Sequence, residues 1–206
     1  MSKVKYCLVY LVFAVGTAGH IVNGLSGLMI SITPYVLLVT GFYVLYFSGL
    51  FKSPEFMKWL AAAYLITLFL EIAGVRTGLI FGEYVYGRVL GFSVSGVPLI
   101  IGFNWIIVIL GAFSVSRLIS DKIIIVSLIT GIISVVFDLI LEPAAIKLGY
   151  WNWLNNTVPV QNYTAWFLIS AAAAFSLMKL KIMIYPVLFI HYLFAMTLFF
   201  IILNFV

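Results

Sequence analysis

The chain has 206 residues, of which 65% are hydrophobic and only 8% are charged, whereas about 25% of the residues of a soluble domain are charged. This composition excludes a soluble globular domain and leaves no room for a nucleic-acid-binding domain. It predicts one polytopic all-α integral membrane domain over 1–206, which we expect in the cell membrane as a multi-pass protein. The single cysteine, Cys7, excludes an internal disulfide and a cysteine-based metal cluster.

Seven apolar stretches, each bounded by charged, polar or proline residues, are close to the length of about 20 residues that a transmembrane helix needs. They predict seven transmembrane helices joined by loops. Thr33 and Pro34 are typical of a helix start, with Thr33 as the cap and Pro34 in the first helical position. The predicted spans are 6–22, 34–51, 57–75, 97–115, 122–141, 163–178 and 182–203.

The net charge of +5 is distributed unevenly over alternate loops. Basic residues are more frequent in cytoplasmic loops than in external loops, so this asymmetry predicts a cytoplasmic N-terminus and an external C-terminus. In this orientation the cytoplasmic side carries Lys3, Lys5, Lys52, Lys58, Arg117, Lys122, Lys179 and Lys181, and the external side carries Arg76, Arg88 and Lys147.

Three carboxyl groups lie near the predicted external ends of helices. Glu71 is near the end of the third span, and Asp138 and Glu142 are near the end of the fifth. The two longest external loops, 76–96 and 143–162, are rich in Tyr, Trp, Asn and Gly, and we expect them to cap a site that contains these acids. Acids inside a membrane are costly and are often functional, although acids at a span end also serve as ion-pair partners in the headgroup region.

Asp138 and Glu142 are four residues apart, so on a helix they share one face and lie about 6 Å apart along its axis. Pro143 disfavours helical geometry at the residue before it, which predicts that the helix ends at Glu142. The negative end of the helix dipole, burial among apolar side chains and repulsion within the pair all favour a protonated acid. At least one of the two carboxyls is therefore expected to hold a proton.

Further candidate binding residues are polar or aromatic side chains at the same predicted depth. Asn104, about two turns into the fourth span, can hydrogen-bond into the pocket or between helices, and the second role is the commoner one. Tyr and Trp at this depth are also typical of the aromatic belt at a membrane interface. The candidates are Arg76, Glu83, Tyr84, Tyr86, Asn104, Trp105, Trp151, Asn162 and Trp166.

Two groups of motifs within residues 70–170 resemble the signatures of the membrane carotenoid-biosynthesis hydratases. The resemblance implies an enzyme that adds water to the ends of acyclic carotenoids such as lycopene or bisanhydrobacterioruberin. The first group is Glu71-Ile72-Ala73-Gly74-Val75-Arg76-Thr77-Gly78, Phe81-Gly82-Glu83-Tyr84-Val85-Tyr86, Leu90-Gly91 and Gly96-Val97-Pro98-Leu99. The second is Asp138-Leu139-Ile140-Leu141-Glu142-Pro143-Ala144, Gly149-Tyr150-Trp151-Asn152-Trp153, Val158-Pro159-Val160-Gln161-Asn162-Tyr163 and Trp166.

Hydration of a trisubstituted isoprenoid double bond begins with protonation of carbon, and water then captures the tertiary cation. This chemistry needs a protonated acid in a dry pocket and one positioned water. We predict Asp138 as the acid and Glu142 as the group that orients or deprotonates the water, and Glu71 can share either role. Aromatic faces suited to stabilise the cation are those of Tyr84, Trp151 and Trp166. No metal or redox cofactor is expected.

The expected partners are a carotenoid or another long isoprenoid and membrane lipid, without nucleic acid. A long polyene partitions poorly into water, so we expect it to enter from the lipid. We predict a narrow apolar tunnel lined by the third to sixth helices and closed at its outer end by the acids.

Two other functions remain open from the sequence. A carotenoid cyclase starts from the same protonation, but its product is an isomer of the substrate, whereas hydration adds one water. A non-enzymatic transporter of lipid or isoprenoid often has internal repeats, and no convincing repeat is present. A prenyltransferase is disfavoured because Asp138 and Glu142 substitute poorly for its magnesium-binding aspartates. A retinal protein is excluded because the last span, 182–203, has no lysine.

Overall fold

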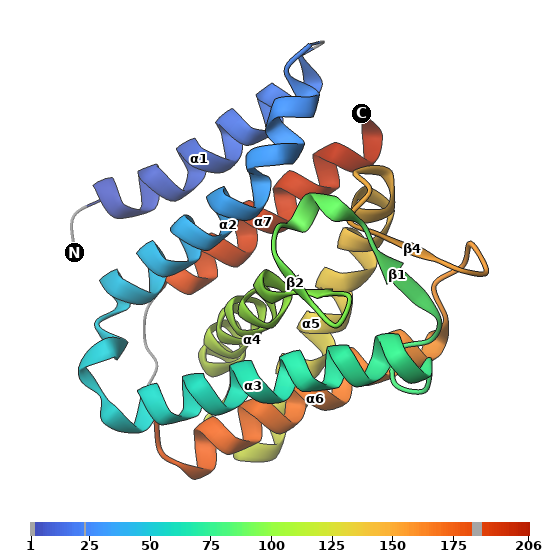
Figure 1. Cartoon of the computed structure of the whole chain (residues 1–206). Helices are drawn as coiled ribbons and strands as arrows, with labels where there is room; N and C mark the ends of the chain where they lie inside the picture. Colours follow the sequence, from blue (N-terminus) through green and yellow to red (C-terminus); the bar gives the residue numbers. More distant parts are fainter. Residues whose placement is uncertain (1–2, 23, 183–186) are drawn as a thin grey trace.

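The structure is a computed structural model that describes residues 3–22, 24–182 and 187–206, and within these ranges it contains seven α-helices (Figure 1). The predicted all-α architecture with seven helices is confirmed. The helices are α1 (Val4–Ile21), α2 (Ser26–Ser48), α3 (Pro54–Thr77), α4 (Leu99–Ile119), α5 (Ile123–Lys147), α6 (Val160–Lys179) and α7 (Val187–Phe205). Short strands lie in the two long loops: β1 (Tyr84–Tyr86), β2 (Ser93–Val94), β3 (Val97–Pro98) and β4 (Trp151–Trp153).

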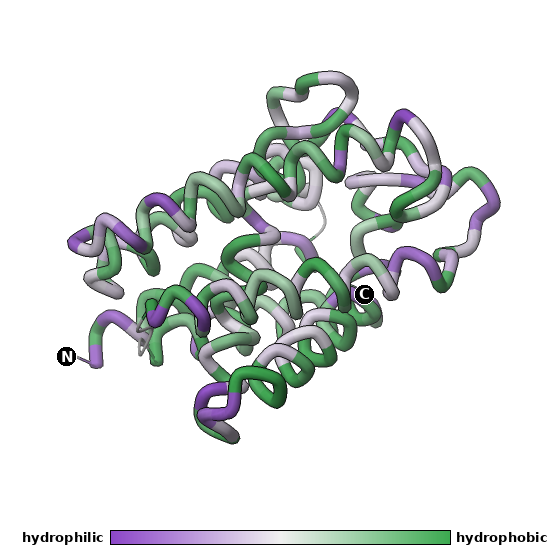
Figure 2. Tube along the Cα trace, turned by 90° about the horizontal axis from the view of Figure 1, so that it is seen from below, coloured by the Kyte–Doolittle hydropathy of each residue, from purple (hydrophilic) through white to green (hydrophobic). Residues whose placement is uncertain are grey.

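Six of the helices in the described ranges are long and apolar enough to cross a membrane, which indicates a multi-pass membrane protein. The helix outside this set is α6, whose first turns carry the polar residues Gln161, Asn162 and Thr164. Figure 2 shows hydrophilic residues mostly at helix ends and in the connections, while the long helices are mainly apolar. This distribution is the one that a lipid environment favours.

Two helix boundaries differ from the sequence predictions because neither proline lies at a helix boundary. The second helix begins at Ser26 instead of Pro34, and Pro34 is buried inside it. The fifth helix continues through Pro143 to Lys147. Packing explains this continuation, since the next two residues, Ala144 and Ala145, are fully buried. A membrane helix tolerates proline when its neighbours satisfy the freed backbone groups.

The third and seventh helices also differ from the predicted spans at their ends. The third begins at Pro54 because the Ser53 hydroxyl accepts a hydrogen bond from the Phe56 backbone N–H, at 3.2 Å. It ends where Gly78 adopts a left-handed conformation with φ 67°. The seventh begins at Val187, while residues 183–186 of the predicted span lie outside the described residues.

The fourth helix forms the centre of the bundle. Most of its side chains are buried, and it contacts α2, α3, α5, α6 and α7. Figure 1 shows α4 in the middle of the molecule, viewed nearly along its axis, between the group α1, α2 and α7 and the group α3 and α6. The first helix packs mainly against α2 and α7. A cavity beside α4 is therefore accessible to side chains from most of the other helices.

An antiparallel two-stranded ribbon connects the two long loops. Strand β1 pairs with β4 so that Tyr84 faces Trp153 and Tyr86 faces Trp151. Because alternate residues of a strand point to the same face, these four aromatic side chains share one face of the ribbon. The second pair, β2 with β3, forms a separate hairpin. The ribbon thus brings together residues that are more than sixty positions apart in sequence.

The close approach of the ribbon strands predicts the effect of a small substitution. The Gly87 N–H donates to the Tyr150 carbonyl at 2.8 Å, and a Cβ at Gly87 would overlap the Gly149 carbonyl oxygen. We expect Gly87→Ala to lower the free energy of unfolding by about 1–3 kcal/mol. Gly27→Ala is the matched control, because Gly27 lies in α2 and a Cβ added there would meet nothing within 4 Å. Thermal unfolding in detergent measures both, and equal stability would contradict the described strand contact.

Candidate functional site

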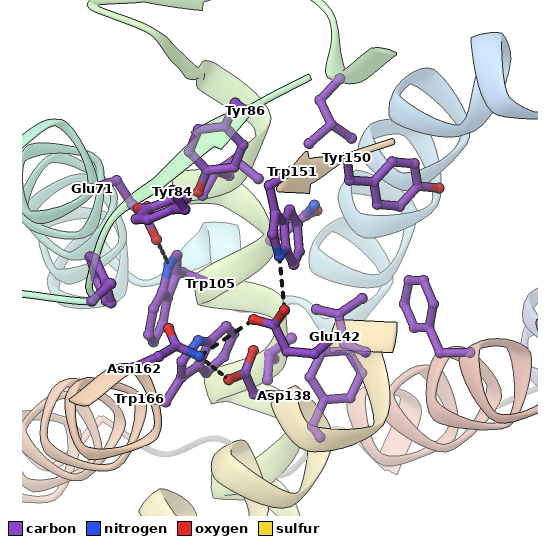
Figure 3. A pocket seen from close by; sticks show the side chains of 18 of the residues that line it. Glu71, Tyr84, Tyr86, Trp105, Asp138, Glu142, Tyr150, Trp151, Asn162 and Trp166 are labelled. Carbon is purple, nitrogen blue, oxygen red and sulfur yellow. Dashed lines mark hydrogen bonds between the residues drawn. The ribbon is translucent and has the colours of Figure 1, made fainter. Parts of the chain in front are cut away.

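A cavity of about 70 Å³ lies inside the bundle beneath the aromatic face of the ribbon. Its wall is formed by side chains from α2 to α7 and from both ribbon strands. Figure 3 shows several of these side chains converging on one space. The candidate residues that line this cavity are Glu71, Tyr84, Tyr86, Asn104, Trp105, Asp138, Glu142, Trp151, Asn162 and Trp166.

The Glu71 carboxylate is 4% exposed and accepts three hydrogen bonds. Its Oε2 accepts from the Tyr84 hydroxyl at 2.5 Å and from the Tyr86 hydroxyl at 2.8 Å. Its Oε1 accepts from Trp105 Nε1 at 2.7 Å, as Figure 3 shows. Donation to both oxygens from three neutral groups is an arrangement that stabilises an ionised carboxylate in a buried position.

The Glu142 carboxylate is held in a similar way from β4. It is 3% exposed, and its Oε2 accepts from Trp151 Nε1 and Trp153 Nε1, both at 2.9 Å. The two indoles reach the same oxygen because they are two residues apart on one strand. The other oxygen, Oε1, has a long contact of 3.4 Å with Asn162 Nδ2. Oε1 is therefore less fully solvated by the protein than Oε2.

The Asp138 carboxyl is the most deeply buried of the three acids, at 1% exposure. Its Oδ2 accepts from Asn162 Nδ2 at 2.6 Å, and the same amide points toward Glu142 (Figure 3). Among the described residues, nothing donates to or accepts from its Oδ1, which is inaccessible from outside the protein. A buried carboxyl with only one donor is far less stabilised as an anion than Glu71 or Glu142.

The charges in the cavity are of one sign. The described part of the wall contains three carboxyl groups and neither Lys nor Arg. Without a countercharge, three carboxylates in an apolar cavity repel one another, so at least one of them holds a proton. Asp138 is the group for which the described residues supply the fewest donors, so its ionised form is the least stabilised of the three.

Aromatic rings cover the space between the acids. Trp105 and Trp166 stack with ring centroids 3.7 Å apart and an interplanar angle of 20°. Across the ribbon, the Tyr84 and Trp153 rings are 5.0 Å apart. Ring faces carry negative electrostatic potential and attract a cation that lies over them. The cavity therefore combines carboxyl groups with electron-rich apolar walls.

The structure places two candidate residues, Arg76 and Glu83, outside this cavity. Both are exposed, and the Arg76 guanidinium donates to Ser95 Oγ at 3.0 Å. Arg76 is five positions after Glu71, which turns it away from the carboxylate around the helix axis. Glu83 directly precedes Tyr84, so its side chain points to the opposite side of the extended segment.

Trp153 and several apolar residues line the cavity although they are not among the candidates predicted from the sequence. Trp153 had a signal, because the alternation Trp-Asn-Trp at 151–153 places two indoles on one face of a strand. The apolar residues are ordinary core types and carried no such signal. The missed residues are Leu37, Phe81, Leu90, Ile101, Val108, Phe137, Leu141, Tyr150, Trp153, Met196 and Phe200.

The described ranges contain no group of three or more His, Cys, Asp and Glu side chains arranged to hold a metal ion.

Residues 32–205 match the family described as "Carotenoid biosynthesis protein". The chain belongs to this carotenoid biosynthesis family. The resemblance seen in the sequence is confirmed. A relative in Haloarcula japonica named bisanhydrobacterioruberin hydratase is 32% identical over 124 residues, which are 55% of this chain and 42% of the relative. The aligned part is thus less than half the length of that relative. No solved structure matches the chain.

The family match covers the whole cavity. Every described residue of the cavity wall, from Leu37 to Phe200, lies within residues 32–205. The first helix lies outside the matched segment and contributes nothing to the described wall. The described wall of the carboxyl cavity is therefore built entirely from the segment that matches the family.

The two phenols bound to Glu71 predict how this family member responds to alkaline pH. Burial, and then the negative charge of Glu71, raise the pKa of Tyr84 and Tyr86 above the ordinary value of 10.0. Above about pH 10 the unfolded chain loses phenol protons that the folded protein retains. The free energy of unfolding then falls by about 1.4 kcal/mol per pH unit for each such tyrosine.

Chemical denaturation at pH values below and above 10 measures this slope. A variant with Tyr84→Phe and Tyr86→Phe should show a shallower slope. Phenolate absorbance of the folded wild-type protein provides a second measurement that needs no variant. If both phenols ionise at their ordinary pKa in the folded protein, the described contacts to Glu71 are wrong.

Proposed function

We propose that the protein is a carotenoid hydratase that adds water to a terminal C=C bond of an acyclic carotenoid. The observation that carries this proposal is the Asp138 carboxyl, which is buried in an aromatic cavity beside two carboxylates that accept more hydrogen bonds. Its Oδ1 has no hydrogen-bond partner among the residues that the structure describes. Membership of a carotenoid biosynthesis family supports the substrate class. The name of the Haloarcula japonica relative supports hydration as the reaction.

In the first step Asp138 donates its proton to the less substituted carbon of the terminal double bond. The π electrons form the new C–H bond, and a tertiary cation is left on the neighbouring carbon. An acid that is poorly stabilised as an anion keeps its proton until the substrate arrives. A substrate that fills the dry cavity then keeps competing water away from that proton. Oδ1 suits this role because no donor or acceptor of the described residues contacts it.

In the second step a water oxygen attacks the cation, and a carboxylate accepts the proton that the water loses. We assign this role to Glu142, because its Oε1 has only the long Asn162 contact, while both Glu71 oxygens accept short hydrogen bonds. Transfer of that proton from Glu142 back to Asp138 completes one turnover. The sum of the two steps is addition of one water, which transfers no electrons and requires no redox cofactor.

Glu71 remains ionised in this mechanism and acts on the cation through its charge. A negative charge in a medium of low dielectric constant stabilises a nearby cation far more than it does in water. A Trp105 or Trp166 ring face that is not covered by the other ring adds about 1–2 kcal/mol to the stability of a desolvated cation that lies over it. Asn162 is a positioning residue, since its amide holds Asp138 and Glu142 on one side of the cavity.

We also propose that the chain is one polytopic domain in the cell membrane, with seven spans, a cytoplasmic N-terminus and an external C-terminus. Figure 1 supports this arrangement, because the start of α1 and the end of α7 lie at opposite ends of the bundle. In this orientation the β1–β4 ribbon and the loops 76–96 and 143–162 form the external cap over the carboxyl cavity. The distribution of Lys and Arg supports the same orientation.

Conservative substitutions of the acids test the mechanism. Asp138→Asn keeps the size of the side chain but removes the acidic proton, so we expect turnover to fall by about a hundredfold to ten-thousandfold. Glu142→Gln should be slower than wild type but active, and exposed Glu83→Gln should have the mildest effect. Asp121→Asn is the matched control, because Asp121 is exposed and forms a surface ion pair with Arg117. Unchanged thermal unfolding of Asp138→Asn would show that it folds.

Mass analysis of carotenoids after expression in cells that make acyclic carotenoids identifies the reaction. A product heavier than the substrate by one water supports hydration. A product that is an isomer of the substrate would indicate cyclisation instead of hydration. Unchanged carotenoid would favour a non-enzymatic carrier. Full activity of Asp138→Asn would refute the assignment of the acid and make Glu71 the next candidate.

The topology predicts which positions an impermeant reagent can reach. Asn155 and Asp121 are both exposed, at opposite ends of α5, and we expect Asn155 to be external and Asp121 cytoplasmic. In a Cys7→Ser background, Asn155→Cys should react with an impermeant maleimide on intact cells, and Asp121→Cys only after lysis. The reverse pattern would invert the topology, and labelling of both positions on intact cells would exclude an odd number of spans between them.

A further inference from the structure

A second cavity, of about 520 Å³, lies beside the carboxyl cavity between α2, α3 and α4. The two cavities share the wall residue Leu90, which is 3% exposed and belongs to the loop between β1 and β2. Neighbouring residues of α4 continue the same boundary, because Ile100 lines the larger cavity and Ile101 lines the carboxyl cavity. The larger cavity is thus separated from the carboxyl groups by a single layer of apolar side chains.

The wall of this larger cavity is apolar and contains flat rings. Phe42 and Phe103 stack at 4.9 Å with an interplanar angle of 27°. The Tyr64 hydroxyl, one of its few polar atoms, donates to the Leu99 carbonyl at 3.1 Å and leaves the ring face apolar. Flat apolar faces are suited to contact a flat hydrocarbon, and they offer no partner to a polar headgroup.

The same cavity opens on the side of the bundle. Tyr35 and Phe42, which line it from α2, are 64% and 49% exposed. Large exposed apolar side chains on a membrane helix face the hydrocarbon. A molecule dissolved in the lipid can therefore reach this groove without passing through water.

We propose that this groove binds the rigid polyene body of the carotenoid while the chain end passes Leu90 into the carboxyl cavity. The proposal rests on the proposed hydratase function for the identity of the occupant. The carboxyl cavity, at about 70 Å³, accommodates only the end of such a molecule. Along α2 the groove runs from Pro34 to Leu45, about 16 Å of helix, which suits a straight conjugated chain.

Two other apolar cavities fit this role less well. One, of about 280 Å³, shares Leu37 with the carboxyl cavity, but much of its wall comes from α1, which lies outside the family match. The other, of about 720 Å³, lies between α3 and α6 and shares no wall residue with the carboxyl cavity. It is also lined by the charged residues Glu55 and Lys58. The groove at α2, α3 and α4 adjoins the carboxyl cavity at Leu90, is larger than the first alternative and lies within residues 32–205.

Three tryptophan substitutions distinguish these cavities. Ala61→Trp fills the proposed groove, Ala62→Trp fills the cavity between α3 and α6, and Ile32→Trp fills the cavity beside α1. Ala61 and Ala62 are adjacent exposed residues of α3, so the two variants carry a matched risk for folding. The measurement is binding of lycopene to the full chain in lipid nanodiscs, which does not require turnover.

We expect Ala61→Trp to weaken lycopene binding by at least about tenfold, while Ala62→Trp and Ile32→Trp bind like the wild type. Wild-type affinity in Ala61→Trp would overturn the proposal, as would loss of binding only in Ala62→Trp or Ile32→Trp. Displacement of co-purified phospholipid by Ala61→Trp with unchanged lycopene binding would assign the groove to a lipid chain instead. If Ala61→Trp weakens lycopene binding but the wild type forms no hydrated product, the proposed hydratase function is refuted and the proposed binding groove is retained.

Discussion

Burial of three carboxyl groups among apolar side chains, without a cation in the described cavity wall, is the constraint on which the site depends. An ionised carboxylate in such surroundings is strongly destabilised unless N–H and O–H groups donate to it. Glu71 and Glu142 together receive six such contacts from described side chains, and four of the donors belong to the β1–β4 ribbon. The buried charges therefore depend on the ribbon for most of the hydrogen bonds that stabilise them.

The ribbon also connects α3 and α5, which have few direct contacts with each other. Strand β1 supplies donors to the acid on α3, and β4 supplies donors to an acid on α5. Pairing of the strands couples these two helices through their carboxylates. Within the described ranges, the side chain that donates to Asp138 is Asn162 of α6, and not a residue of the ribbon. One arrangement thus produces two stabilised anions and one acid that favours its proton, which is the separation of roles that the proposed mechanism needs.

Much of this structure could be predicted from local sequence, and the failures have a common cause. Apolar stretches gave seven helices because lipid leaves the backbone few alternatives. Pro34, predicted at a helix start, and Pro143, predicted just after a helix end, both lie inside helices, because tertiary packing outweighs the local preference of proline for a helix boundary. The prediction that Arg76 and Glu83 line the cavity was wrong. Both are close in sequence to cavity residues, but their side chains point to another side of the helix or of the extended segment. The pairing of Tyr84 with Trp153 is non-local, and no local pattern encodes it.

The size of the carboxyl cavity has a consequence for product choice. At about 70 Å³ the cavity must contain both the chain end and the attacking water, and one water needs roughly 10–15 Å³ of such space. Under the proposed mechanism the bulk of the end group therefore determines how many waters remain beside the cation. A compact end leaves a nucleophile in place, whereas a bulkier end expels it and leaves the cation to lose a proton or to rearrange. Steric volume, more than acidity, then governs the partition between alcohol and hydrocarbon products.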